Sequence, residues 1–171
     1  MDSRAKKYYG AFLDLSDHAC LVVGAGMVAE RKVKALLRSG AKVTVVSPAA
    51  TPWFHECHEK GQLVWHARPY VPTDVEGVTI VFAATDSRVV NRKVYADATA
   101  VHAFVNVADD AQLCTLTVPA VVHKSCLQVA ISTLGQSPTM AKKLREALEY
   151  DLIHGTRTFQ ETIQRFEENG G

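Results

Sequence analysis

The fold is decided by the stretch Ala19-Cys20-Leu21-Val22-Val23-Gly24-Ala25-Gly26-Met27-Val28-Ala29. Its first five residues are apolar and predict a short strand, and a glycine pattern follows at once. Apolar residues at helical spacing then predict a helix as far as Ser39, which Gly40 ends as a C-terminal cap. The stretch therefore predicts a strand, a tight turn and a helix in direct succession.

The same alternation continues to the middle of the chain. A second strand at residues 43–46 begins within three residues of Gly40, and such a crossover implies parallel strands. The later strands are apolar without alternation, which indicates a parallel sheet covered by helices on both faces. The sequence thus predicts an α/β fold. The further expected elements are a helix at 51–60, strands at 63–67 and 78–84, a helix at 88–100 and a strand at 104–107.

The pattern changes after Asp110. Residues 116–122 and 127–133 both resemble strands, and the short polar turn 123–125 between them leaves no room for a crossover helix. Neighbouring strands with so short a connection pair in the antiparallel direction. We therefore expect a β-hairpin in this part of the chain.

Helices are expected to complete the chain. Ser137 and Pro138 supply an N-cap and a first-turn proline for a helix that runs to about Tyr150. A last amphipathic helix is expected over residues 156–168. We divide the chain into a domain at 1–112, a region at 113–148 and a short helical C-terminal segment at 149–171.

The overall charge excludes a strongly basic or acidic protein. There are 19 Lys and Arg residues against 18 Asp and Glu residues, which gives no general attraction to nucleic acid or to an acidic membrane. The N-terminus is polar, and no stretch approaches the roughly 18 apolar residues of a membrane span. We expect a soluble cytoplasmic protein whose partners include neither nucleic acid nor a membrane.

The cysteines and histidines favour neither disulfides nor a metal site. The four cysteines lie far apart without a CxxC spacing, which is typical of small apolar residues in a reducing compartment. His55, Cys57 and His58 are crowded together, but spacings of i and i+3 on one helix give at most two ligands. We interpret these three residues as part of a surface helix and expect no bound metal.

The glycine pattern predicts a dinucleotide site because it follows a strand and opens a helix. Gly24 permits the tight turn, Gly26 lets a diphosphate approach the backbone, and Ala29 lets the helix pack closely on the strand. Free backbone amides and the positive end of the helix dipole would hold the phosphates. The ends of the second and fourth strands should lie on the same rim. The candidate cofactor-binding residues are Gly24, Ala25, Gly26, Met27, Val28, Ser47, Pro48, Ala49, Thr85 and Asp86.

The end of the second strand bears on the choice of cofactor. NAD sites usually carry an acidic residue there to bind the ribose hydroxyls, and this chain has Ser47 instead. No arginine replaces it within residues 47–52, so an obvious clamp for a 2′-phosphate is also missing. The sequence therefore favours NAD over NADP.

A set of short motifs extends over most of residues 12–148. They are Phe12-Leu13-Asp14-Leu15, residues 22–32, Ala84-Thr85-Asp86 with Val90-Asn91, Asn106-Val107-Ala108-Asp109-Asp110 with Leu113-Cys114, and Pro119-Ala120 with Gln128-Val129-Ala130-Ile131-Ser132-Thr133 and Gly135-Gln136-Ser137-Pro138. Together they resemble the precorrin-2 dehydrogenase family, which includes bifunctional forms that also insert iron into sirohydrochlorin. The segment 128–138 is the most specific part of the resemblance.

The resemblance implies a Rossmann domain, a small dimerisation domain and a helical C-terminal segment, assembled as a homodimer with the tetrapyrrole in the cleft between domains. It implies NAD-dependent oxidation of precorrin-2 to sirohydrochlorin on the route to sirohaem and, as an open alternative, to cobalamin. Asp109 matches the family's catalytic aspartate and follows the fifth strand, where ligands gather in open α/β sheets. An Asp109-Asp110 pair is otherwise a common turn former.

A polyanionic substrate requires cationic and amide donors. The late segment offers hydroxyls and the free amides of a helix start, and Lys142, Lys143 and Arg145 add charge. For each lysine taken separately, however, the sequence favours a solvated helix face. We interpret the basic residues Arg31, Lys32, Lys34 and Arg38 of the first helix mainly as a solvated face. The candidate substrate-binding residues are Ser132, Thr133, Gly135, Ser137 and Lys142.

Two alternatives remain open. The first is a bifunctional dehydrogenase and ferrochelatase, since Asp109 could also accept pyrrole protons. Leu134 replaces a glycine common in the family, which is expected to narrow the loop before Ser137. The chain ends soon after Tyr150, and for this reason we expect weak or absent chelatase activity. The second is a non-catalytic NAD-sensing regulatory domain, which would leave the segment 132–138 without a purpose.

Overall fold

The structure is a computed structural model that describes residues 7–155. These residues form two compact units. The first comprises residues 10–116, and the second comprises residues 117–155 together with residues 7–9.

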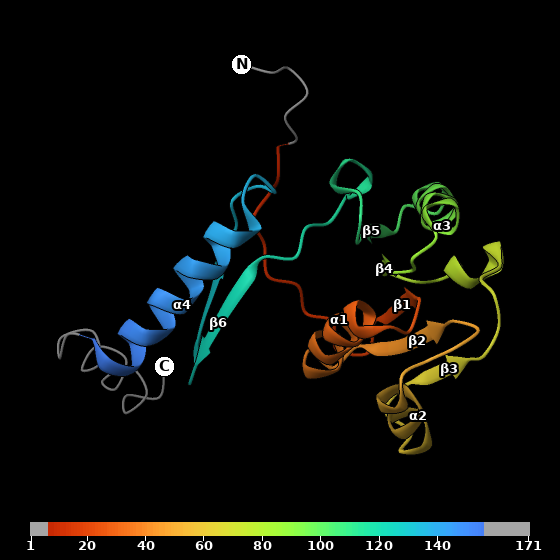
Figure 1. Cartoon of the computed structure of the whole chain (residues 1–171), viewed down its shortest axis with the longest axis horizontal. Coiled ribbons are helices and arrows are strands. Elements are labelled where there is room, and N and C mark those ends of the chain that lie inside the picture. Colours follow the sequence, from red (N-terminus) through yellow and green to blue (C-terminus); the bar gives the residue numbers. More distant parts are fainter. Residues whose placement is uncertain (1–6, 156–171) are drawn as a thin grey trace. The chain divides into compact units, whose positions relative to one another are not determined.

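A parallel five-stranded sheet forms the first unit (Figure 1). Its strand order is β3-β2-β1-β4-β5, and every neighbouring pair is parallel. The strands are β1 (Ala19–Val23), β2 (Lys42–Val46), β3 (Val64–His66), β4 (Ile80–Ala83) and β5 (Phe104–Val107). The helices are α1 (Met27–Arg38), α2 (Pro52–Glu59) and α3 (Arg88–Ala100), with short 3-10 helices η1 (Pro72–Val75) and η2 (Ala111–Leu113). The predicted Rossmann-type fold is confirmed.

Two apolar cores lie on opposite faces of this sheet. On one face α1 and α2 pack over the strands, with Val33 and Phe54 fully buried. On the other face α3 packs through residues such as Val94 and Ala98. Because both faces are covered, the central strands are apolar throughout, and β4 is buried at all four positions. This explains why the strands lack the polar alternation of a half-exposed sheet.

The first helix ends as its sequence predicts. Gly40 adopts φ +73°, its N–H donates to the Leu37 carbonyl, and the N–H of Ala41 donates to the Leu36 carbonyl. This pair of bonds is a Schellman motif, which glycine favours because it has no Cβ to strain the left-handed conformation. The motif turns the chain directly into β2.

The strand order reverses between β1 and β4. From β1 the chain builds outward to β2 and β3, and it then returns to place β4 on the other side of β1. In open α/β sheets, ligands bind beyond the carboxyl ends of the strands at this point of reversal. Val23 lies opposite both Val46 and Ala83, and Ala83 lies opposite Val107. The loops that follow β1, β2, β4 and β5 therefore start at one common edge.

The second unit contains the predicted hairpin, but the expected bounds were wrong. Its strands are β6 (Ala120–Lys124) and β7 (Leu127–Ile131), and the turn is the pair Ser125-Cys126, with Ser125 at φ +47°. The segment at 115–116 is not part of β6, because the N–H groups of Thr115 and Leu116 donate to the Val105 carbonyl. The apolar residues just before the hairpin thus bind the edge of the first unit's sheet.

The last described helix is α4 (Pro138–His154), which begins at the predicted N-cap. It continues past Tyr150, the predicted end, and Leu152 on this extra turn is only 2% exposed. Burial of that side chain explains the longer helix. The helix predicted at 156–168 lies outside the described residues. Among residues 7–155, no helix is both long enough and apolar enough to cross a membrane.

Candidate active site

The glycine loop after β1 is built around a close backbone contact. Gly24 has φ +105°, and a Cβ at this position would overlap the carbonyl oxygen of Ala84 in the loop after β4. Its N–H donates to the carbonyl of Val46, the last residue of β2, at 2.9 Å. Glycine is therefore required both for its conformation and for this approach. The contact joins the loops that follow three adjacent strands.

Gly26 serves a different purpose in the same loop. It is the N-cap of α1, it has no side chain to cap the helix, and the space around its Cα is open. The first N–H groups of a helix lack intrahelical acceptors, and the helix dipole adds partial positive charge there. Met27 and Val28 are exposed, whereas Ala29 is fully buried against the sheet. This arrangement fits the diphosphate of a dinucleotide.

In the loop after β2, the polar groups of Ser47 are hydrogen-bonded within the protein. The Ser47 hydroxyl donates to the Ala49 carbonyl at 2.7 Å, and the Ser47 carbonyl accepts from the Trp65 indole N–H at 3.1 Å. Pro48 and Ala49 are exposed. Arg68, which comes shortly after β3, binds both carboxylate oxygens of Asp74. The guanidinium of Arg68 is therefore already paired.

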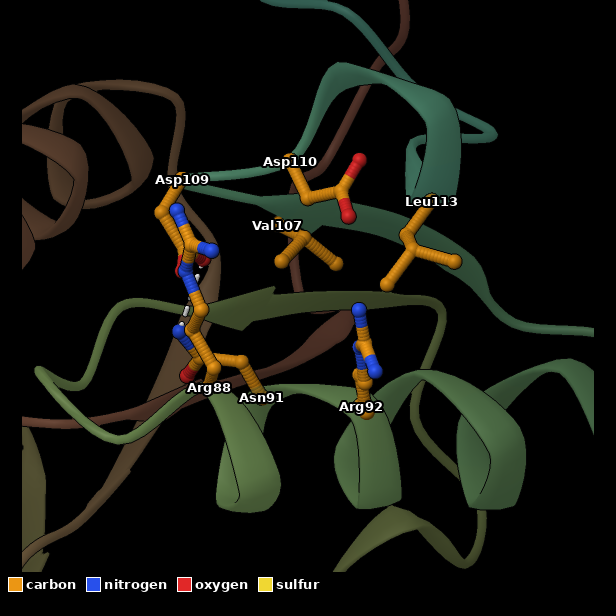
Figure 2. A pocket seen from close by; sticks show the side chains of 7 residues that line it. All are labelled: Arg88, Asn91, Arg92, Val107, Asp109, Asp110 and Leu113. Atoms are coloured by element: carbon orange, nitrogen blue, oxygen red, sulfur yellow. Dashed lines mark hydrogen bonds and ion pairs between the residues drawn. The ribbon is translucent and has the colours of Figure 1, made fainter.

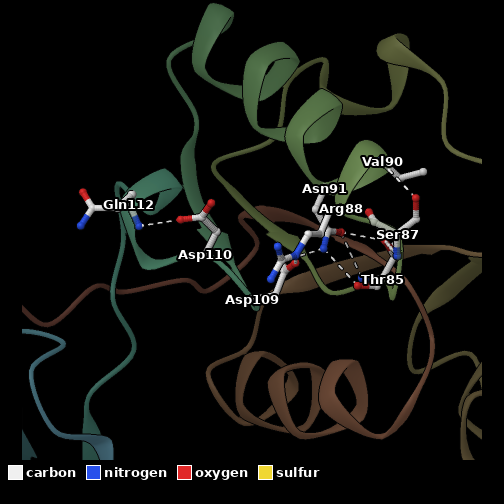
Figure 3. A network of polar contacts seen from close by, with 8 residues as sticks. All are labelled: Thr85, Ser87, Arg88, Val90, Asn91, Asp109, Asp110 and Gln112. Atoms are coloured by element: carbon white, nitrogen blue, oxygen red, sulfur yellow. Dashed lines mark hydrogen bonds and ion pairs between the residues drawn. The ribbon is translucent and has the colours of Figure 1, made fainter.

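A polar network joins the loop after β4 to the loop after β5 (Figure 3). The Asn91 side chain, only 1% exposed, accepts from the N–H and the hydroxyl of Thr85 at 3.2 and 2.7 Å. Its amide nitrogen donates to the Thr85 carbonyl at 3.0 Å and to the Asp109 carboxylate at 2.9 Å. One buried amide thus uses both its donors and its acceptor to hold two rim segments together. Asp86, the neighbouring candidate, is exposed.

The two adjacent aspartates have different environments. Asp109 is exposed, and its second carboxylate oxygen lies 3.5 Å from the Arg88 Nε. Asp110 turns toward η2 and accepts the N–H of Gln112 at 3.0 Å (Figure 3). Asp110 is therefore the turn former of the pair, while Asp109 presents a carboxylate at the edge of the sheet that carries the glycine loop.

A second buried polar cluster lies on the α1 face of the sheet. The Lys32 ammonium donates to the Asn106 side-chain oxygen at 2.7 Å and lies 4.8 Å from the centre of the Phe82 ring. Burial lowers the pKa of Lys32 to about 8, and the nearby Arg31 contributes to this lowering. The Asn106 amide nitrogen donates to the Leu116 carbonyl at 3.0 Å. Lys32 is thus a half-buried group bonded within the protein, and not simply part of a solvated face.

The candidate substrate-binding residues lie in the second unit, mostly in the turn that leads into α4. Thr133 and Ser137 exchange two hydrogen bonds, and the Ser137 hydroxyl caps α4 by accepting the Met140 N–H at 3.2 Å. The Ser132 hydroxyl accepts the N–H of Leu134 at 3.1 Å. These hydroxyls build the turn itself, so any ligand contact would use their remaining hydrogen-bonding capacity.

The other groups of this segment are more open. Gly135 has φ +80° with open space around its Cα, and Lys142 is exposed, with Glu146 at 3.8 Å. Arg145 is paired with both Glu146 and Glu149. Lys142 is therefore better placed than Arg145 to accept a new anionic partner.

The histidines and the cysteine of α2 pack locally. The His55 ring lies edge-on to Trp65 with centroids 4.5 Å apart, and Cys57 is buried in the core. His58 Nδ1 lies 3.3 Å from the Leu63 carbonyl and 3.4 Å from the Trp65 N–H. Among the described residues, no cluster of three or more His, Cys, Asp or Glu side chains could hold a metal ion.

Sequence reasoning from individual residues did not identify Asn91, Arg88 or Arg92. Asn91 had a detectable signal, because it shares the buried face of α3 with Val94 and Ala98 at spacings of three and seven residues. A polar amide on such a face requires buried partners. Their identity depends on how α3 meets the loop after β5, and no local pattern contains that information.

Comparison with known proteins agrees with this geometry. Residues 11–120 match the family model of a putative NAD(P)-binding domain, and residues 126–149 match the central domain of sirohaem biosynthesis proteins. A siroheme synthase from Pectobacterium atrosepticum is 43% identical over 142 residues, which cover 83% of this chain and 30% of that protein. A siroheme synthase from Photorhabdus laumondii is 37% identical over 161 residues, covering 94% and 34%.

A solved structure extends the comparison to the fold. The precorrin-2 dehydrogenase SirC is 30% identical and superposes with a TM-score of 0.80, covering 94% of this chain and 78% of SirC. The chain spans only about a third of the length of the siroheme synthases that it matches. It carries a nicotinamide-cofactor domain joined to the central sirohaem-biosynthesis domain. The chain belongs to the family of precorrin-2 dehydrogenases and sirohaem synthases.

Proposed function

We propose that this protein oxidises precorrin-2 to sirohydrochlorin with NAD as the hydride acceptor, in the synthesis of sirohaem. The main support for this proposal is the chain of hydrogen bonds from Thr85 through Asn91 to Asp109. It places a carboxylate at the same sheet edge as the glycine loop, so that a proton acceptor and a dinucleotide site are neighbours. The likeness to SirC, a precorrin-2 dehydrogenase, supports the choice of substrate.

The reaction removes two electrons and two protons from the macrocycle. A bound NAD would supply a hydride acceptor for two electrons and one proton, so the other proton must leave separately. Asp109 is exposed and accepts a hydrogen bond from Asn91 on one oxygen, which leaves the other oxygen accessible beside Arg88. We assign this carboxylate the role of general base. Gly24, Ala25, Gly26, Met27 and Val28 would hold the diphosphate.

Three finer features complete the proposal for the cofactor. Ser47, Pro48 and Ala49 would border the adenosine ribose, and Thr85 and Asp86 would border the nicotinamide. The preference for NAD over NADP is supported by the lack of a basic residue in residues 47–52 and by the pairing of Arg68 with Asp74. A 2′-phosphate would therefore gain no ion pair from this loop.

The second unit is proposed to bind substrate and to dimerise. Ser132, Thr133, Gly135, Ser137 and Lys142 are the residues we assign to substrate binding, because they surround the capped start of α4 and an exposed ammonium. Exposed apolar side chains on α4, namely Met140, Leu144, Tyr150 and Ile153, support a homodimer contact by this unit. The four free cysteines, three of them buried, support a reducing compartment such as the cytoplasm.

An absorbance assay with the purified protein tests the function. Precorrin-2 and NAD should yield NADH together with the spectrum of sirohydrochlorin, and NADP should be used less well. Binding of NAD without any change in the tetrapyrrole would show a nucleotide sensor and overturn the proposal. Insertion of iron or cobalt into sirohydrochlorin in the absence of NAD would add chelatase activity to the dehydrogenase.

A further inference from the structure

The first two turns of α3 carry charges that helix stability disfavours. Arg88 is the first residue of the helix and Arg92 lies one turn later. A cation near the N-terminus opposes the helix dipole, and like charges at i and i+4 repel each other. The first turn contains no acidic residue to compensate. Such a departure from local preference is characteristic of functional sites.

Both arginines line the same small pocket beside Asp109 (Figure 2). Their guanidinium groups are directed toward the loop that follows β5, and Val107 and Leu113 form the apolar part of the lining. Asn91 and Asp110 complete the pocket. The pocket therefore combines two guanidinium groups with an apolar surface, next to the carboxylate that we assign as the general base.

The two arginines differ in how many partners their guanidinium groups already have within the protein. The Nε of Arg88 lies 3.5 Å from the Asp109 carboxylate, a long contact for an ion pair, and its side chain is 79% exposed. The Arg92 guanidinium has no hydrogen-bond or ion-pair partner among residues 7–155. Asp110 is already bonded to the Gln112 N–H. Most of the guanidinium donors in this pocket are thus available to an anion from outside.

We propose that Arg88 and Arg92 form a subsite for the carboxylate side chains of the substrate, beside the reacting part of the ring. This inference rests on the proposed function, because precorrin-2 carries acetate and propionate groups around its macrocycle. Each guanidinium can hold a carboxylate by two parallel hydrogen bonds. The apolar lining would contact the adjacent methylene groups. A substrate carboxylate that pairs with Arg88 would replace the long contact between Arg88 and Asp109.

Glutamine substitutions test the subsite. Arg92→Gln is the clearest variant, because the Arg92 guanidinium has no hydrogen bond or ion pair to another described residue, and Arg88→Gln follows. Each should raise the KM for precorrin-2 roughly tenfold, and the double variant should raise it further, since each removes charge-assisted hydrogen bonds. Lysine at either position should recover part of the loss by retaining charge without the planar fork. Lys93→Gln, an exposed change on the same helix outside the pocket, should leave the KM unchanged.

Two further measurements distinguish binding of substrate carboxylates from phosphate binding and from a purely structural role. Fluorescence titration should give the same NAD affinity for Arg92→Gln as for the wild type; weaker NAD binding would show that the arginines hold a phosphate and would overturn the proposal. Thermal unfolding should show equal or higher stability for the glutamine variants, because repulsion along α3 is removed. If the variants instead unfold at a lower temperature and the rise in KM follows from this instability, the arginines have a structural role. That result would also overturn the proposal.

The outcome for the proposed function remains distinguishable. If the wild type oxidises precorrin-2 and the Arg92→Gln and Arg88→Gln variants keep its KM, the subsite is wrong while the function stands. If the wild type does not oxidise precorrin-2, direct binding of sirohydrochlorin, measured by absorbance titration, still tests the subsite. Equal affinity of wild type and double variant in that titration would overturn it.

Discussion

The two buried asparagines on opposite faces of the sheet show how one residue type serves two purposes. Asn91 on the α3 face is bonded to Thr85 and ends at Asp109, an exposed carboxylate. Asn106 on the α1 face is bonded to Lys32 and to the Leu116 carbonyl, all within the protein. The first network ends at an exposed carboxylate, whereas the second ends at a half-buried ammonium and a backbone carbonyl. The first network therefore supports the proposed catalytic role of Asp109, and the second holds the segment that ends the first unit.

The largest effect is expected at the exposed end of the Asn91 network. Asp109→Asn removes the proposed base but retains an oxygen that can accept from Asn91, and kcat should fall by roughly 10²- to 10⁴-fold. NAD affinity, measured by titration, should be nearly unchanged because the glycine loop is intact. Wild-type turnover in this variant would remove Asp109 from the mechanism.

A matched pair of isosteric changes compares the two networks directly. Asn91→Asp replaces the amide donor by a carboxylate that faces Asp109, so repulsion should displace the base and lower kcat by roughly ten- to a hundredfold. Asn106→Asp keeps the contact to Lys32 and loses the bond to the Leu116 carbonyl, so it should cost stability but retain turnover close to that of the wild type. Steady-state kinetics at one pH measures both. Equal losses in the two variants would break the distinction between a chemical and a structural network.

The sequence predicted the framework of the first unit well, because its signals are local. The bounds of α3 and β5 coincide with those expected, since apolar spacing and strand length determine them. The hairpin was misplaced because Leu116 and its neighbours are as apolar as a strand but bind the edge of β5. Lys32 was interpreted as solvated because its burial depends on Phe82 and Asn106, which are distant from it in sequence.

The internal cluster should have its own pH signature. The pKa of Lys32 is about 8 in the folded protein, below its ordinary value of 10.5, so the unfolded chain binds its proton more tightly. The wild type should therefore gain stability as the pH rises from 8 to 10.5, by about 2 kcal/mol. Lys32→Met should lack this gain, and denaturant unfolding of both proteins at pH values of about 7.5 and about 10 measures it. Parallel pH profiles would mean that Lys32 is solvated.

The smallest expected effect concerns the hydroxyl of Thr85. Thr85→Val keeps the shape but loses the contact to the Asn91 oxygen at 2.7 Å, which should cost about 1 kcal/mol of stability and lower kcat severalfold. Thr99→Val is the matched control on α3, because the Thr99 hydroxyl donates only to carbonyls of its own helix. Stability and turnover measured together distinguish the two. Loss of activity in both variants would show that α3 acts through its general stability.

The two glycines of the β1 loop also differ in what a mutation there would reveal. Because Gly24 touches the backbone at Ala84, any side chain at position 24 would push apart the loops after β1 and β4, and with them Thr85 and its bond to Asn91. Such a variant would change folding, cofactor affinity and turnover together, so its defect could not be assigned to one of them. Gly26 has open space and an ordinary φ, so Gly26→Ala should leave the protein backbone undisturbed and obstruct only the proposed diphosphate position. A substitution at position 26 is therefore expected to lower the affinity for the proposed cofactor without changing how the loops pack.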